Sequence, residues 1–164
     1  MNLSIHTLKS IFLLLTIAAP LFGFIILTLR ALIFNTATER IIALVARSSF
    51  VLSIFSLVGL LILLTFTDLA ASSDLVLPWF KVGTHRYDIS FASDNFSLSF
   101  LALIAILGGL ASVFSETYLH QERGYERFYI LLLLATFGMN LVVAANSLSL
   151  MVIGWSFWVS HLRF

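Results

Sequence analysis

The side chains that could do chemistry are few and lie at the ends of apolar stretches. The 164 residues include four histidines and no cysteine, so disulfides, thiolate metal sites and iron–sulfur ligation are excluded. Haem needs axial ligands that face the interior of a helix bundle. The histidines lie outside the apolar stretches or in the C-terminal tail: His6, His85, His120 and His161. We therefore expect solvated or interfacial histidines, with no haem, other cofactor, metal site or catalytic residue.

The charged side chains have structural explanations. Asp94 opens Asp94-Asn95-Phe96-Ser97 just before an apolar stretch, where its carboxylate is expected to cap a helix. A second, mixed-sign group predicts a solvated connection whose local ion pairs contribute under about 1 kcal/mol. Its members are Glu116, Glu122, Arg123, Glu126 and Arg127. The net charge of +1 leaves no basic face for nucleic acid.

Neutral residues inside the apolar stretches predict helix packing. Asn140 is the one strongly polar side chain well inside a stretch, and an interhelical hydrogen bond is its expected role. Pro20 and Gly23 predict a kink in the first stretch. Small side chains that let helices approach closely form one face of the third stretch: Ala105, Gly108, Gly109 and Ser112.

The elements that carry these residues are membrane helices. The chain is 60% apolar and 10% charged, with a mean hydropathy of +1.07, so lipid is its expected solvent. A spanning helix needs roughly 20 consecutive apolar residues. Four stretches without Asp, Glu, Lys or Arg meet that length: 10–29, 48–67, 95–115 and 128–162.

The last stretch, of 35 residues, is too long for one spanning helix and too short for two. The expected bend is marked by Asn140, Asn146, Ser147 and Ser149, and it divides the stretch into a helix at about 128–145 and an apolar segment at 148–159. The second piece cannot cross a core about 30 Å thick. The predicted fold is an all-α integral membrane protein with four transmembrane helices plus a partial fifth.

One long loop separates two halves of this arrangement. Within 68–94, the apolar run 75–82 and the strictly alternating segment 86–91 flank Gly83 and Thr84, which predicts an irregular or β-hairpin external loop. The expected organisation is two helices in 1–67, the external loop in 68–94, and helices three, four and a truncated fifth in 95–164.

The basic residues predict an orientation. One side carries Arg30, Arg40, Arg47, Arg123 and Arg127, and the other carries Lys9, Lys81 and Arg86. Because Lys and Arg favour the cytoplasmic side, we expect the N-terminus outside an inner (cytoplasmic) membrane. The aromatic residues expected at headgroup level are Trp79, Tyr87, Tyr118, Tyr125 and Tyr129. The expected partners are the lipid bilayer and other membrane subunits.

An ordered set of short motifs runs through the second half of the chain. The motifs are Asp94-x-x-Ser97, Tyr118-Leu119, Glu126-Arg127-Phe128, Gly138-Met139, Asn146 and Gly154-Trp155. This order resembles the N-terminal part of the antiporter-like, proton-translocating subunits. The family includes chain 5 (the L subunit) of respiratory complex I, the large subunit of Mrp-type antiporters and the membrane subunit of inorganic-carbon uptake systems. The resemblance implies a longer fold built from inverted repeats of broken helices.

The chain departs from that family after Trp155. There the family has a protonatable glutamate, in a Trp-Glu-x-x-Gly motif, whereas this chain has Ser156. Restoring one G after the tryptophan codon, with Ser156 encoded by AGT or AGC, makes the shifted frame read Trp, Glu and, three residues later, Gly. We therefore expect a frameshifted, truncated product of a longer transporter gene.

The resemblance implies the leading fragment of a proton-conducting subunit of an NADH:quinone oxidoreductase-like, cation/proton antiporter or bicarbonate-uptake complex. The fragment is expected to be inactive in translocation by itself, and at most a non-catalytic subunit of such an enzyme. The residues that could touch a proton path are Asn140, Trp155 and Ser156. The alternative is a small non-conducting membrane scaffold or accessory subunit.

Overall fold

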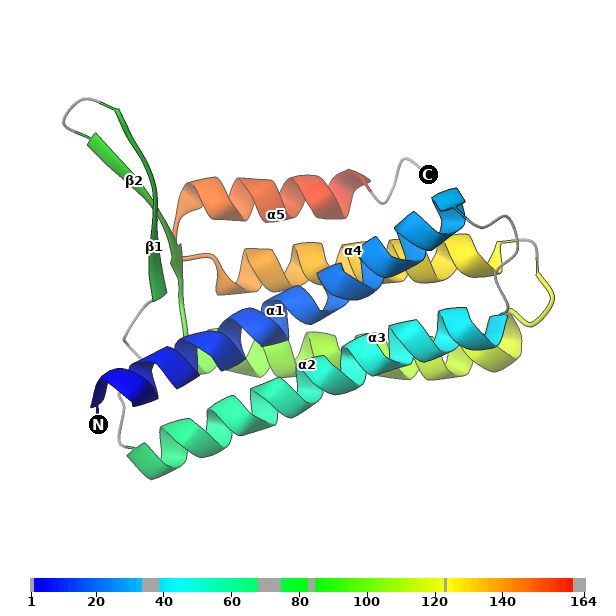
Figure 1. Cartoon of the computed structure of the whole chain (residues 1–164), viewed down its shortest axis with the longest axis horizontal. Helices are drawn as coiled ribbons and strands as arrows, with labels where there is room; N and C mark the ends of the chain where they lie inside the picture. Colours follow the sequence, from blue (N-terminus) through cyan, green and yellow to red (C-terminus); the bar gives the residue numbers. More distant parts are fainter. Residues whose placement is uncertain (1, 34–38, 68–74, 83–84, 123, 161–164) are drawn as a thin grey trace.

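The described part of the chain consists of five helices and one β-hairpin. A computed structural model describes residues 2–33, 39–67, 75–82, 85–122 and 124–160. The helices are α1 (Asn2–Ile33), α2 (Glu39–Thr67), α3 (Asn95–Tyr118), α4 (Tyr125–Ala144) and α5 (Leu148–Ser160). Strands β1 (Leu75–Val82) and β2 (His85–Phe91) pair in antiparallel fashion. Figure 1 shows the helices running along the long axis, with the hairpin projecting at the end that holds the N-terminus.

Helices α1 to α4 are long and apolar enough to cross a membrane, whereas α5, with 13 residues, is not. The predicted all-α membrane fold with four spans and a partial fifth is therefore confirmed, and so is the hairpin. The register of the hairpin shifts between Pro78 and Phe80. Pro78 has no N–H to donate, which is why this irregularity lies beside it.

The first two helices are longer than the charge-free stretches that predicted them. Lys9 and Arg30 lie inside α1, and Arg40 and Arg47 lie inside α2 rather than in a connecting loop. Lys and Arg are good helix formers, so either can end an apolar stretch without ending the helix. Lys9 is also only 3% exposed, although the sequence placed it outside the span.

Side-chain caps mark two of the helix starts, of which the cap at Asp94 was predicted. Asp94 is the N-cap of α3, and its Oδ1 accepts a hydrogen bond from the Ser97 backbone N–H at 3.4 Å. Hydrogen bonding from Ser97 lowers the pKa of the Asp94 carboxyl below its ordinary value. Ser147 caps α5 in the same way, with its Oγ accepting from the Leu150 N–H.

The bend between α4 and α5 is held by the end of the hairpin. The Asn146 N–H donates to the Ser90 carbonyl at 3.0 Å, and the Ala92 N–H donates to the Ala144 carbonyl at 2.9 Å. Free backbone groups at a helix end need partners, above all in a bilayer. The loop before α3 therefore closes the end of α4. The predicted bend is confirmed at Asn146 and Ser147, whereas Asn140 lies inside α4 and Ser149 inside α5.

Candidate functional site: a polar cluster at the proline break of the first helix

Pro20 leaves one carbonyl of α1 without its helical partner. Proline has no N–H, so the carbonyl four residues earlier, that of Thr16, receives no bond from position 20. Thr16 is fully buried, and its own hydroxyl donates to the Phe12 carbonyl at 2.8 Å. An unpaired carbonyl in the apolar interior would cost several kcal/mol, so the position requires a donor from elsewhere.

Two side chains from other helices supply donors to that carbonyl. The Ser53 hydroxyl of α2 donates to Thr16 O at 2.9 Å, and the Asn140 Nδ2 of α4 donates to it at 3.5 Å. Ser53 and Asn140 are each 1% exposed. Three helices thus meet at one backbone oxygen, and we call Thr16, Ser53 and Asn140 the Thr16 cluster.

Two buried atoms, one within this cluster and one a turn along α2 from Ser53, have no hydrogen-bond partner within the described part of the chain. They are Asn140 Oδ1 and Ser56 Oγ, both in buried side chains. The amide orientation follows from the contact itself, because a carbonyl oxygen only accepts and Asn140 must therefore present its nitrogen to Thr16. The amide oxygen, Asn140 Oδ1, can only accept a hydrogen bond, and it has no donor among the described residues.

The other two residues considered for a proton path lie away from this cluster. Trp155 is 53% exposed and, with Trp158 and Met139, lines an open apolar groove of about 280 Å³. Ser156 is exposed, and its hydroxyl donates to the Val152 carbonyl of its own helix at 2.8 Å. The structure therefore does not bring Asn140 together with Trp155 and Ser156.

The small-residue face of α3 lies against α2. Ala105 and Ser112 are each 2% exposed and Gly108 is buried, whereas Gly109 is half-buried. A Cβ added to Gly108 would lie 2.5 Å from Phe50 Cε1, so the Phe50 ring occupies the space of the missing side chain. A Cβ on Gly109 would make ordinary contacts at 3.7 Å or more. Gly108 is thus the position where this face admits the neighbouring ring.

Helices α4 and α5 approach each other backbone to backbone, a contact that the sequence did not predict. A Cβ on Gly138 would meet the Trp158 backbone N at 2.9 Å, and one on Gly154 would meet the Val142 backbone N at 2.9 Å. In the sequence the two glycines stand in separate motifs, Gly138-Met139 and Gly154-Trp155. Their sixteen-residue separation across a helix break gave no periodicity from which this contact could be predicted.

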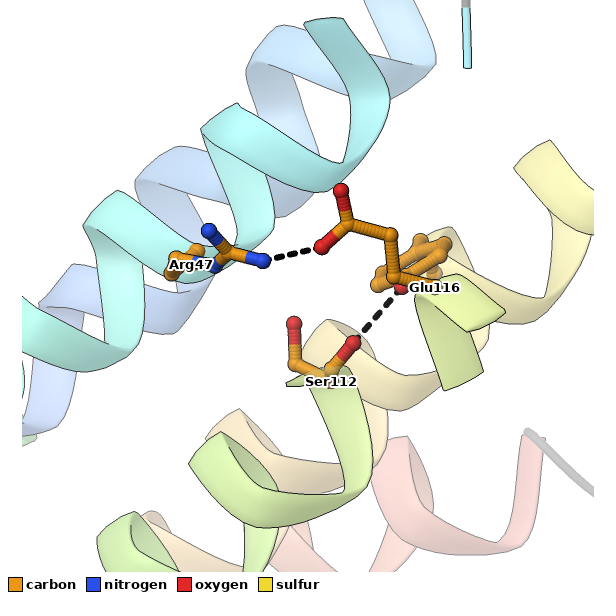
Figure 2. A network of polar contacts seen from close by, with 4 residues as sticks. Arg47, Ser112 and Glu116 are labelled. Atoms are coloured by element: carbon orange, nitrogen blue, oxygen red, sulfur yellow. Dashed lines mark hydrogen bonds and ion pairs between the residues drawn. The ribbon is translucent and has the colours of Figure 1, made fainter. Parts of the chain in front are cut away.

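The end of the bundle opposite the hairpin gathers charged residues from separate helices. Arg47 of α2 pairs with Glu116 of α3, as Figure 2 shows, and Ser112 lies one turn along α3. His120 Nδ1 lies 2.7 Å from Glu39 Oε2, and the Gln121 N–H donates to Glu39 Oε1 at 3.0 Å. The expectation of purely local pairs is wrong, because Glu116 lies in α3 and finds its partner 69 residues away. His6, His85 and His161 have side chains outside the described residues.

Two tyrosines expected at headgroup level are inside the bundle. Tyr125 is 4% exposed and Tyr129 is fully buried, whereas Tyr118 is 89% exposed. Tyr129 is accommodated because its hydroxyl donates to the Ser112 carbonyl at 2.7 Å, so the only polar atom of its side chain is satisfied. The side chains of Trp79 and Tyr87 lie outside the described residues.

The depth between the two charged ends carries neutral side chains only. Residues 10–29, 48–67, 95–115 and 128–160 contain no Asp, Glu, Lys, Arg or His. The Thr16 cluster is thus an uncharged hydrogen-bonding site, able to accept and donate hydrogen bonds but without a group that titrates near neutral pH.

A family model described as "NADH-Ubiquinone oxidoreductase (complex I), chain 5 N-terminus" matches residues 79–129. NADH-quinone oxidoreductase subunit L of Buchnera aphidicola subsp. Schizaphis graminum is 30% identical over 143 residues, covering 86% of this chain and 22% of that protein. The chain matches the N-terminal part of the antiporter-like subunit family. The motifs from Asp94 to Trp155 indicated the same family.

Other members of the antiporter-like subunit family give the same picture. Subunit L of Escherichia coli K12 is 30% identical over 149 residues, which is 86% of this chain and 22% of that protein. NADH-ubiquinone oxidoreductase chain 5 of Allomyces macrogynus is 27% identical over 139 residues, covering 85% of this chain and 21% of that protein. The chain thus spans about a fifth of the length of these relatives. With its four apolar helices it is a multi-pass membrane protein.

Proposed function

We propose that this chain forms the leading helical region of a proton-translocating subunit and does not move protons by itself. The complex would be an NADH:quinone oxidoreductase or a related cation/proton antiporter or bicarbonate-uptake system. The observation that carries the proposal is the match to subunit L across 86% of the chain. The motifs from Asp94 to Trp155 support it.

The lack of activity follows from the chemistry of the spans. A proton path through hydrocarbon needs groups that take up and release protons, and such groups lie at membrane depth in transporters. Between the charged ends this chain offers hydroxyl and amide groups, which do not titrate near neutral pH. Ser156 stands where the family has a glutamate. Of the three residues considered for a proton path, Asn140 alone is in the interior. Its amide would lie beside such a path but would not take up or release a proton.

A flux assay tests this part of the proposal. The purified chain is reconstituted in liposomes containing a pH-sensitive dye, and a potassium gradient with valinomycin supplies the driving force. We expect proton entry at the rate of protein-free liposomes, both for the natural chain and for Ser156→Glu, because the single carboxylate has no relay on either side. Proton flux above that rate would refute the proposal.

A non-conducting scaffold is the second candidate, favoured by the close packing at Gly108, Gly138 and Gly154. A chimera separates the two functions. Residues 1–155 replace the matching segment of E. coli subunit L, and NADH-driven proton pumping is measured in membrane vesicles. Proton pumping by the chimera would support the proposal that the chain is the leading region of a conducting subunit. A chimera that assembles with the complex but does not pump supports the scaffold.

We also propose an inner (cytoplasmic) membrane location with the N-terminus and the hairpin outside. The bundle end opposite the hairpin carries Arg30, Arg40 and Arg47. Basic residues close to spans favour the cytoplasmic side. Other membrane subunits would then cover the exposed apolar faces of α5.

A further inference from the structure

The two unpartnered atoms beside the Thr16 cluster belong to the same part of the interior. Ser53 and Asn140 both donate to the Thr16 carbonyl, so their side chains lie together. Ser56 follows Ser53 by three residues, which places both on one face of α2. Farther along that face, a Cβ on Gly59 would lie 3.1 Å from Phe12. Ser56 thus lies on α2 between Ser53, which bonds to Thr16, and Gly59, which faces the Phe12 ring.

The chemistry of the two atoms is complementary to one small ligand. Asn140 Oδ1 can only accept a hydrogen bond, whereas the Ser56 hydroxyl can donate one. A molecule that bonds to both must donate to the amide oxygen and accept from the hydroxyl. Water does both, and it is small enough for a packed helix interface.

We propose that one buried water molecule binds here, donating to Asn140 Oδ1 and accepting a hydrogen bond from the Ser56 hydroxyl. Leaving a buried amide oxygen unpaired costs more than ordering a water molecule, so binding is favourable. The water molecule would lie within the membrane near the Pro20 break, at the place where α1, α2 and α4 meet.

A dehydrated cation fits this site poorly. It would need several oxygen ligands and a negative charge to offset the loss of its hydration shell. The spans contain no carboxylate at this depth. The Thr16 carbonyl already accepts two hydrogen bonds, which leaves little capacity for a metal ion. The neutral ligand is therefore the one that these residues accommodate.

Magnetisation transfer from water tests the site in the full chain, reconstituted in lipid vesicles and studied by solid-state NMR. The reporter is the side-chain amide of Asn140, and the reference is the backbone amide of fully buried Leu133. We expect transfer to Asn140 to be several-fold faster than to Leu133. Equal, slow transfer at both amides would show a dry interior and overturn the inference.

A matched pair of serine variants assigns the second contact. Ser56→Ala should remove the fast transfer at Asn140. Ser49→Ala, on the same face of α2, should leave it unchanged, because the Ser49 hydroxyl already donates to the Val45 carbonyl at 2.9 Å. Unchanged transfer in Ser56→Ala would contradict the proposed contact. A shift of the Asn140 signals when sodium replaces potassium would assign a cation site instead of water. None of these outcomes depends on whether the chain conducts protons.

Discussion

At the scale of single residues, the interior tolerates polar groups wherever a backbone carbonyl is within reach. Thr16, Ser53, Asn140 and Tyr129 are all buried, and each donates to a carbonyl oxygen. In hydrocarbon an unpaired donor cannot bond to water. These hydrogen bonds therefore determine which polar side chains can be buried between the helices. The buried polar residues are therefore informative about helix contacts, and less so about catalysis.

Tyr129→Phe tests the hydrogen bond to Ser112. The substitution keeps the ring within its packing and removes the hydroxyl, so we expect a loss of about 1 kcal/mol in unfolding free energy. The measurement is thermal or SDS-induced unfolding followed by circular dichroism. Tyr118→Phe is the control, because Tyr118 is 89% exposed. Equal stability of Tyr129→Phe and the natural chain would show that this bond contributes nothing.

Asp94→Ala tests the cap of α3. We expect a loss of about 1 kcal/mol, the usual contribution of a capping carboxylate. Because hydrogen bonding lowers the pKa of Asp94 in the folded state, its charge-dependent stabilisation is complete above the ordinary value of 3.8 and is lost as pH falls through the lower folded-state pKa. Unfolding of both proteins is followed from pH 6 downward. The stability difference should shrink at the acid end, and a difference that grows there would contradict the assignment.

At the scale of elements, glycine decides how closely α5 approaches α4. The backbones meet where Gly138 and Gly154 face each other, and a Cβ on either would lie 3.0 Å from a carbonyl oxygen of the other residue. Association of helices in lipid relies on close packing rather than on the hydrophobic effect. The glycine contact lies beside other packing between the two helices, because the Phe137 and Phe157 rings meet edge to face at 5.6 Å and Leu150 packs in one core cluster with Leu141.

Gly154→Ala should loosen that contact. The added methyl group lies 2.9 Å from Leu141 Cβ and from the Val142 backbone N, and backbone atoms cannot swing aside, so we expect a cost of about 1–3 kcal/mol. Trp155 and Trp158 on α5 report the change through tryptophan emission. Gly124→Ala is the matched control, because a Cβ there meets nothing within 4 Å. Identical emission and stability in the two variants would argue against close packing.

At the scale of the whole molecule, the bundle has two chemically different ends. One end carries the hairpin and the N-terminus, and the other carries the Arg47–Glu116 pair and the Glu39–His120 contact. Ion pairs between such exposed groups contribute under about 1 kcal/mol to stability. Their charges have more influence on which end stays in the cytoplasm.

Single cysteines determine the orientation, because the natural chain has none. Val76→Cys lies on the hairpin and Tyr118→Cys at the opposite end, where the natural side chains are 52% and 89% exposed. We expect a membrane-impermeant maleimide to label Val76→Cys in intact cells, and Tyr118→Cys only after the cells are opened. Ala105→Cys, at a position 2% exposed, should resist labelling in both states. The reverse pattern would place the N-terminus inside.

The amino-acid sequence by itself determined the membrane fold, the number of spans, the hairpin, the cap at Asp94 and the bend at Asn146. These features follow from local composition. The length of a charge-free stretch, the alternation of polar and apolar residues and the presence of a capping residue each depend on neighbouring positions in the chain. The motif order from Asp94 to Trp155 also determined the family. The burial of Tyr125 was not predictable in this way, because a tyrosine near a span end suits either the headgroups or the interior.

Only the tertiary structure decided which helices share their polar groups. The partners Thr16 and Ser53 lie 37 residues apart, and Asn140 lies 124 residues from Thr16. Pro20 implies that the Thr16 carbonyl lacks its helical hydrogen bond, but no local pattern predicts which helix supplies its donors. The same holds for Gly138 with Gly154 and for Arg47 with Glu116. Contacts of this kind depend on how rigid helices dock, and docking is settled by shape and by unsatisfied hydrogen bonds across the whole bundle.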